Sequence, residues 1–266
     1  MDLVNEALRA PAAPPPPTRK SPRAVLVVGG GGVLGAAVLE QLLGCGGFAP
    51  VRVLVTRPFK GSVSALRAIV PTPFDDERVA TQALSDVAVV VFDRARHANG
   101  RDDAFARVEP QALPVLAGWL RRQAVRDVVV VMPHGPVELP QALKLGLANL
   151  DEHAVAAQGF EHVVFVRSAQ RPGDGRGGPW LQRVADWMLR QLQLMLPVTQ
   201  QPVQVHKVAR FVAELAVQLP DSAPGTRVAS PELVWQAAQQ THAGRFVADW
   251  LAGAELPPST PARPRL

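Results

Sequence analysis

The chain has 266 residues, of which 47% are hydrophobic and 19% are charged, and its formal net charge is +5. Such a chain can bury a large core, which excludes disordered and collagen-like classes. No apolar run reaches the roughly 18 residues that span a bilayer, and the start lacks a signal-peptide core, so we expect a cytoplasmic protein without membrane association. Cys45 is the only cysteine, which excludes an internal disulfide and a multi-cysteine zinc site.

The basic residues are dispersed along the sequence. Residues 1–22 carry a net charge of +1 and residues 257–266 carry +2, which leaves +2 for the 234 residues between them. A surface that binds a nucleic-acid duplex needs a concentrated basic stripe. We therefore expect no nucleic-acid partner.

Valine-rich apolar runs alternate with longer helical patterns through the centre of the chain. The runs predict strands at Ala24–Val28, Val51–Thr56, Val87–Asp93, Asp127–Met132 and His162–Arg167. Helices are predicted near Val33–Leu43, Ser62–Ile69, Phe105–Gln123, Leu139–Gln158, Trp180–Leu196, Val205–Leu219 and Pro231–Gln240. A third strand is expected between Ile69 and Ser85, and Val79–Ala80 is its best-marked position.

This alternation predicts the fold class. Uninterrupted valine runs such as Val128–Val131 are typical of parallel strands that are covered on both faces. Strand–helix alternation then predicts an α/β, doubly wound parallel-sheet Rossmann fold, with helices on both faces and a small C-terminal substrate-side extension.

The prolines indicate where the folded domain begins and ends. Ten of the 26 prolines lie at the two ends of the chain. We therefore expect a disordered Pro-rich tail over 1–22, one Rossmann domain over 23–256 with a C-terminal portion from about 168, and a disordered tail over 257–266.

A glycine cluster at the end of the first predicted strand carries the strongest functional signal. Residues 25–35 read VLVVGGGGVLG, so a strand, four glycines and a helix follow one another. Glycines here permit a tight turn, and the helix N-terminus offers free N–H groups to a pyrophosphate. Two registers fit, Gly30/Gly32/Gly35 or Gly29/Gly32/Gly35, and the alternative is a glycine-rich turn without ligand. The predicted cofactor-binding residues in this loop are Gly29, Gly30, Gly31, Gly32, Val33, Leu34 and Gly35.

The end of the second predicted strand bears on the choice of dinucleotide. An acidic residue there would bind the ribose hydroxyl of NAD, but the sequence continues as Thr-Arg-Pro-Phe-Lys, without a carboxylate. Arg57 is placed to meet a 2′-phosphate, and Lys60 can add a second cation. We therefore predict NADP, with NAD as the alternative if Arg57 is only a solvated loop cation.

These segments resemble a known family. The sequence VLVVGGGGVLG resembles the opening of extended and atypical short-chain dehydrogenases/reductases, which use the register Gly29/Gly32/Gly35. Phe105-Ala106-Arg107-Val108-Glu109, Val166-Arg167-Ser168 and the segment 202–209 resemble further segments of the Tat-interacting-protein oxidoreductase branch. The resemblance extends over about residues 24–238 and is specific only at the glycines.

The resemblance implies a catalytic tyrosine, a lysine one helical turn later, and a serine or threonine after the fifth strand. The chain contains no tyrosine. Counted without gaps, the tyrosine position falls on Lys144, the lysine position falls on Ala148, and the serine region, residues 131–134, has no hydroxyl. Lys144 and His134 are weak candidates for a replacement acid, because imidazole titrates near neutral pH and a lysine beside other cations can have a lowered pKa. The alternative is a solvated helix lysine and a strand-end histidine.

Other polar clusters carry weaker signals. His153 and His162, with their acidic neighbours, have a helix-to-strand spacing that does not predict convergence, so we expect no metal site. Arg94, Arg96, His97 and Arg101 follow the fourth strand and are read as solvated, or as contacts to an anionic ligand. Ser168 has no triad partners at recognisable positions. An apolar stripe over 180–195 predicts core packing, or a wall of a small-molecule cleft near residues 168–195, or a face for a homodimer or a protein partner.

Two functions of different classes follow from these predictions. One is a nucleotide-binding sensor, scaffold or subunit that keeps the dinucleotide loop without turnover. The other is an NAD(P)H-dependent oxidoreductase with a substituted proton donor that acts on a small carbonyl substrate. The missing tyrosine favours the first.

Overall fold

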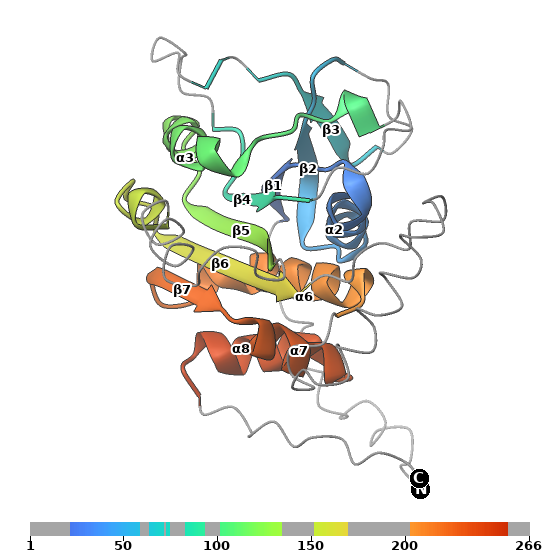
Figure 1. Cartoon of the computed structure of the whole chain (residues 1–266), viewed down its shortest axis with the longest axis vertical. Coiled ribbons are helices and arrows are strands. Elements are labelled where there is room, and N and C mark those ends of the chain that lie inside the picture. Colours follow the sequence, from blue (N-terminus) through green and yellow to red (C-terminus); the bar gives the residue numbers. More distant parts are fainter. Residues whose placement is uncertain are drawn as a thin grey trace, which may run out of the picture.

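The computed structural model of the chain describes residues 22–58, 64–71, 73–74, 83–93, 102–134, 152–169 and 203–254 (Figure 1). At residues 102, 133, 134, 168 and 169 it describes the backbone alone. Within these ranges, no helix combines the length and apolar character that a bilayer crossing requires.

In the described part of the chain, seven strands form one sheet, in which every neighbouring pair is parallel. Along the sheet the strands follow the order β3-β2-β1-β4-β5-β6-β7. Their bounds are β1 Arg23–Val28, β2 Phe48–Leu54, β3 Leu66–Ile69, β4 Val87–Val91, β5 Asp127–His134, β6 His162–Ala169 and β7 Gly225–Ala229. The first six positions reproduce the strand order of doubly wound dinucleotide-binding folds, so the chain has a Rossmann-like α/β fold.

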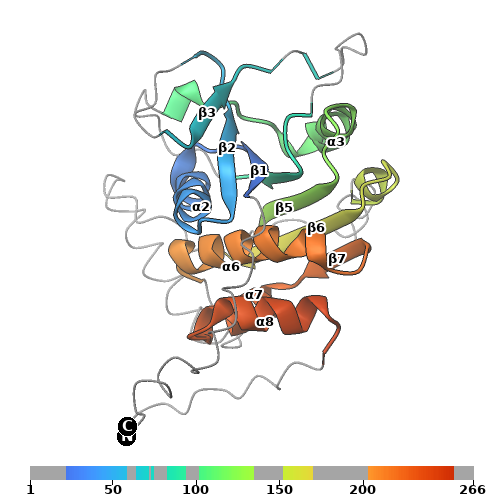
Figure 2. The same ribbon diagram turned by 180° about the vertical axis from the view of Figure 1, so that it is seen from behind.

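Helices cover both faces of this sheet (Figures 1 and 2). Their bounds are α2 Gly32–Gly44, α3 Leu113–Arg122, α6 Val205–Gln218, α7 Pro231–Gln239 and α8 Ala243–Leu251, and residues 152–156 are also helical. Short 3₁₀ turns occur at η1 Asp102–Ala104, η2 Pro110–Ala112 and η4 Leu219–Asp221. On one face lie α2, α6, α7 and α8; on the other lie α3 and the helical turn at 152–156.

Alternate residues of each central strand face opposite cores, as the valine runs predict. Val129 and Val131 of β5 belong to the core beneath α6, whereas Val128 and Val130 belong to the core beneath α3. All four are at most 1% exposed. A strand buried on both faces requires an unbroken apolar run, and this explains why the central strands are so clearly marked in the sequence.

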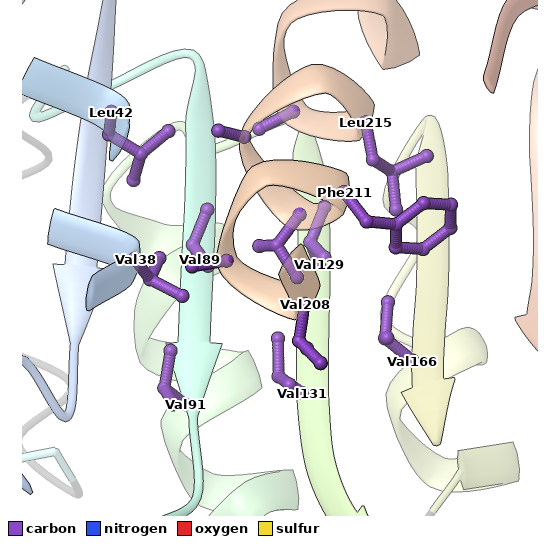
Figure 3. Packing of buried hydrophobic residues seen from close by; sticks show 14 of the residues in the cluster. Val38, Leu42, Val89, Val91, Val129, Val131, Val166, Val208, Phe211 and Leu215 are labelled. Atoms are coloured by element: carbon purple, nitrogen blue, oxygen red, sulfur yellow. The ribbon is translucent and has the colours of Figure 1, made fainter. Parts of the chain in front are cut away.

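Helix α6 fills the centre of the larger core. Its apolar residues recur three and four positions apart and therefore lie on one face of the helix. Figure 3 shows this face above the strands, with α2 beside it. The residues labelled there are Val38, Leu42, Val89, Val91, Val129, Val131, Val166, Val208, Phe211 and Leu215.

Most predicted central elements are confirmed. The structure places strands at five predicted positions, and α2, α6 and α7 agree with the predicted helices within two residues. The predicted tails lie outside the described residues, except for Pro22, and so does the helix predicted over 180–196. Of the helix predicted over 139–158, only residues 152–158 are described, and 152–156 are helical.

The helix predicted over residues 62–69 is wrong, and so is the placement of the third strand after it. Residues 66–69 form β3, which pairs with Val51–Leu54 of β2. Ala, Leu and Arg favour a helix locally, but pairing with an existing strand overrides this propensity at a sheet edge. The best-marked position predicted for the third strand, residues 79–80, lies outside the described residues.

The helix predicted from residue 105 begins eight residues later, at Leu113. Phe105 instead forms an antiparallel bridge with Val55, and residues 106–109 have no regular structure. The segment Phe105–Glu109, which resembles a family motif, therefore precedes α3 and does not open it.

Strand β7 and helix α8 have no counterpart among the predicted elements. Strand β7 is a half-exposed edge strand without a continuous apolar run, so its sequence does not indicate a strand.

Candidate functional site

The glycine loop, residues 29–35, joins β1 to α2 at the carboxyl edge of the sheet. Gly29 has φ +81° and Gly32 has φ +79°, a region that side-chain-bearing residues rarely adopt. A Cβ on Gly29 would collide with the carbonyl oxygen of Val91, and a Cβ on Gly35 would collide with that of Gly29. The steric requirement for glycine therefore falls on Gly29, Gly32 and Gly35, which is the second of the two predicted registers.

The loop lies where open α/β sheets bind ligands. Strands β2 and β4 flank β1 on opposite sides, so the direction of the strand order reverses at this point. Crevices at such switch points, outside the carboxyl ends of the strands, are the usual nucleotide sites of this fold. The first turn of α2, Gly32 to Leu34, points its free N–H groups into this region.

One of these N–H groups already has a partner. The amide of Leu34 donates a hydrogen bond to Oδ2 of Asp93, at 2.7 Å. The N-cap of α2 is Gly31, which has no side chain to accept this bond, and the first turn contains no acidic residue. Asp93, two residues beyond β4, thus caps α2 from a neighbouring strand. Sequence reasoning missed this role, although Asp93 ends a predicted strand that the fold places beside β1.

Part of the chain crosses the carboxyl end of β2. Thr56 donates through its amide to the carbonyl of Ala104, at 2.8 Å, and through Oγ1 to the carbonyl of Asp103, at 2.9 Å. Phe105 extends from this crossing to the glycine loop, where its ring lies 3.1 Å from the position of a Cβ on Gly30. Residues 102–106 therefore line the region next to the loop that a Rossmann fold uses for the adenosine half of a dinucleotide.

Of the two cationic residues predicted to bind the 2′-phosphate, the structure describes one. Arg57 is exposed and follows β2, as predicted, whereas Lys60 lies outside the described residues. The crossing segment also brings a carboxylate that the sequence does not place near β2. Asp103 has a half-exposed side chain and pairs with Arg107 at 3.8 Å.

The replacement acids are not brought together by any described contact. His134 is the last residue of β5, where its backbone is described without its side chain, and Lys144 lies outside the described residues. The backbone of Ser168 is paired in register with Pro133 at the same edge. These two roles therefore remain predictions. Arg94, Arg96, His97 and Arg101 also lie outside the described part of the chain.

An ion pair near the carboxyl end of β6 was not predicted. Nη2 of Arg167 lies 2.7 and 3.0 Å from the two carboxylate oxygens of Glu152. Both side chains are largely buried, with 27% and 11% of their surfaces exposed. The segment Val166–Ser168 thus has a structural role, because Arg167 ties β6 to the helical turn at 152–156.

Among the residues that the structure describes, three potential metal ligands converge, and they lie at the opposite edge of the sheet. Asp127, Glu161 and His162 place one ligand atom each within 4.8 Å of the others. Nδ1 of His162 lies 2.6 Å from Oδ1 of Asp127, and Nε2 lies 3.1 Å from the carbonyl oxygen of Ser222. Both ring nitrogens are therefore occupied, and the group ties together the starts of β5 and β6. His153, the other predicted member, is exposed on the helical turn at 152–156.

Burial raises the pKa of the Asp127 carboxyl, and the hydrogen bond from His162 opposes this shift. The carbonyl of Ser222 can only accept a hydrogen bond, and which ring nitrogen of His162 donates depends on the tautomer. The pair is a buried contact at the opposite end of the strands from the glycine loop.

Comparisons with known proteins concern the fold. No protein-family model matches the sequence, and no curated protein matches it. The chain is similar to WbmG of Bordetella bronchiseptica, solved with NAD and UDP, at 16% identity over 93% of this chain and 84% of that chain, with a TM-score of 0.44. A Rossmann-fold NAD(P)-binding family protein from Shigella flexneri is 14% identical over 76% of this chain and 89% of that chain, with a TM-score of 0.47. A nucleoside-diphosphate-sugar epimerase from Staphylococcus aureus is 12% identical over 77% of this chain and 70% of that chain, with a TM-score of 0.46.

These similar structures include one described as a Rossmann-fold NAD(P)-binding protein and one described as a nucleoside-diphosphate-sugar epimerase. Their sequence identity is low, so the fold assignment depends on the strand order and pairing of this chain itself. The resemblance to the Tat-interacting-protein branch remains a prediction.

Proposed function

We propose that this chain binds a nicotinamide dinucleotide at the glycine loop. One observation carries the proposal: a side chain on Gly29 or Gly35 would collide with the backbone of β4 or of the loop, and Gly32 has a positive φ of +79°. A loop without side chains allows a diphosphate to approach the backbone and the first-turn N–H groups of α2. Isothermal titration calorimetry with NADPH and NADH tests the proposal, and the absence of heat of binding for both nucleotides would refute it.

We propose NADP as the preferred form. Arg57 is exposed three residues beyond β2, at the sheet edge where the 2′-position of the adenosine ribose lies in this fold, and a guanidinium suits phosphate oxygens. Arg57→Ala is therefore expected to weaken NADPH binding by about tenfold or more, with little effect on NADH. Equal losses for the two nucleotides would remove the assignment of the 2′-phosphate to Arg57. Arg52→Ala, a half-buried arginine within β2, provides the control for loss of one arginine from this strand.

We further propose that the bound dinucleotide serves a sensor, scaffold or subunit role. The support is compositional: the chain contains no tyrosine to transfer the proton to a substrate oxygen, and no hydroxyl lies in residues 131–134. NADPH oxidation measured across a panel of aldehydes, ketones and enones is expected to remain at the rate without protein. Turnover that falls in Lys144→Ala or His134→Ala would instead establish a reductase with a substituted acid.

A further inference from the structure

The carboxylate of Asp93 lies at the position that the proposed function gives to a phosphate. Its Oδ2 accepts from the amide of Leu34, at 2.7 Å. A Cβ on Gly32 would lie 2.6 Å from the same oxygen. The carboxylate therefore occupies the space left by the missing side chain of Gly32, against the first turn of α2.

A carboxylate and a diphosphate are attracted to this point for the same reason. The amino end of a helix carries a partial positive charge and unpaired N–H groups, and either anion can satisfy them. The first turn has three such groups, at Gly32, Val33 and Leu34, and Asp93 takes the third. A diphosphate that entered the same space would lose this donor and would approach a like charge.

We infer that Asp93 is a built-in competitor of the dinucleotide: its carboxylate holds the amino end of α2 in the free chain and must leave Leu34 when a diphosphate binds. The inference rests on the proposed function, and it names the residue that sets the affinity of that site. Asp93 thereby lowers the affinity of the loop for the dinucleotide, although the glycines of the loop would allow the dinucleotide to bind tightly.

If Asp93 were only a helix cap, a different dinucleotide affinity would be expected for its variants. As a cap, Asp93 stabilises α2 through an acceptor oxygen, and an asparagine side chain supplies such an oxygen as well. Asp93→Asn therefore retains the capping acceptor and removes only the negative charge. If capping were the whole role, this variant would bind a dinucleotide no better than the wild type.

The test is calorimetric titration of NADPH and NADH into the wild type, Asp93→Asn and Asp93→Ala. Asp249→Asn is the matched control, because it removes one exposed carboxylate from α8, which packs on α6 away from the loop. We expect Asp93→Asn to bind NADPH at least about tenfold more tightly than the wild type, since one repelling charge is lost. The control is expected to stay within about twofold of the wild type.

The outcomes separate this inference from the proposed function. Binding by the wild type with equal or weaker binding by both Asp93 variants overturns the inference and leaves the proposed function standing. No binding by any of the proteins overturns both. A measurement on the unaltered chain covers the case in which the variants do not fold: in a crystal soaked with NADPH, a diphosphate oxygen must replace Asp93 on the Leu34 amide. A diphosphate bound while Asp93 remains on that amide overturns the inference.

Discussion

Two glycines of the same helix provide a test of close backbone packing in the loop. Gly35 and Gly44 both lie in α2, but a Cβ on Gly35 would meet the carbonyl oxygen of Gly29, whereas a Cβ on Gly44 would meet nothing within 4 Å. Gly35→Ala is therefore expected to lower the free energy of unfolding by about 3 kcal/mol, because backbone must move to admit the methyl group. Gly44→Ala is expected to be neutral or to add up to about 1 kcal/mol, as alanine favours helices.

Urea unfolding of the two variants and the wild type checks this prediction. Similar free energies for Gly35→Ala and Gly44→Ala would mean that the loop can yield and that its glycines are not sterically required. Because both substitutions add one methyl group to one helix, differences in helix propensity are largely matched. The comparison therefore isolates the contact between α2 and the loop.

At the residue scale, the sequence was enough to predict positions that local segments determine. The glycines of the loop and the exposed Arg57 belong to short segments with a recognisable order of strand, turn and helix. Asp93 and Glu152 could not be found in this way, because their partners Leu34 and Arg167 are distant in sequence. Such pairs become visible only when the strand order is known, since adjacency in the sheet decides which side chains meet.

At the scale of the element, α6 joins the two halves of the sheet through a single apolar face. Phe211 is 1% exposed and lies in the core that α2, α6 and the central strands share (Figure 3). Phe211→Ala is expected to lower the free energy of unfolding by about 3–5 kcal/mol, because it leaves a cavity in a close-packed core. His206→Ala, on the exposed side of the same helix, is expected to change it by no more than about 0.5 kcal/mol.

Chemical denaturation followed by circular dichroism measures both α6 variants. A loss below about 1 kcal/mol for Phe211→Ala would show that the core collapses around the vacancy, contrary to its central position. An equal loss of unfolding free energy for His206→Ala would mean that any substitution in α6 destabilises the helix, whether or not the residue is buried. The difference between the two variants is therefore the quantity to compare.

The buried pair that joins the starts of β5 and β6 predicts a dependence of stability on pH. Burial raises the pKa of Asp127 above the usual 3.8, so the folded chain holds a proton that the unfolded chain releases. The stability that Asp127 contributes is therefore complete below pH 3.8 and is lost as the pH rises through the raised pKa. Asp127→Asn lacks this titration, so the wild type should lose stability relative to the variant as the pH increases from about 3.5.

Urea unfolding of both proteins at a series of pH values tests the sign of this dependence. The difference between their free energies of unfolding cancels the titration of carboxylates that they share. A difference that moves in favour of the wild type as the pH rises would contradict the effect of burial and make the hydrogen bond from His162 dominant. A constant offset between the proteins does not affect the test, because only the slope is compared.

Elements were predictable in proportion to how completely they are buried. The strands β1, β4 and β5, covered on both faces, appear in the sequence as uninterrupted apolar runs. The edge strands β3 and β7 are half exposed, and their short sequences LRAI and GTRVA favour no strand by themselves. They become strands because β2 and β6 offer unpaired backbone groups at the sheet edges, which is a property of the assembled sheet.

At the scale of the whole molecule, alternation along the chain was enough to predict a parallel sheet with helices on both faces. The strand order then follows from right-handed crossovers on both sides of β1, and it brings β4 and β2 to the two flanks of the glycine loop. What the alternation cannot predict is the path of residues 102–106 across the end of β2, because this crossing depends on backbone hydrogen bonds to Leu54 and Thr56. The fold was therefore predictable as a topology, and the surroundings of the site were predictable only in part.

A ligand that binds only the folded chain raises its unfolding temperature, so the proposed function makes a prediction for the whole molecule. At a concentration one hundred times the Kd, a dinucleotide adds about 2.7 kcal/mol to the free energy of unfolding. For a domain of this size the corresponding increase in Tm is roughly 5–10 °C. Differential scanning calorimetry with NADPH measures it, and nicotinamide mononucleotide, which lacks the diphosphate bridge, is the control at the same concentration and ionic strength.

The comparison of NADPH with nicotinamide mononucleotide shows which part of the dinucleotide provides the binding free energy. If the glycine loop holds the diphosphate, NADPH should raise Tm and the mononucleotide should leave it within about 1 °C of the free chain. An equal increase for both would assign the binding to the nicotinamide half, away from the first turn of α2. Under the competition that Asp93 imposes, the wild type should also need a higher NADPH concentration than Asp93→Asn to reach half of its maximal increase, although the two proteins share the same loop.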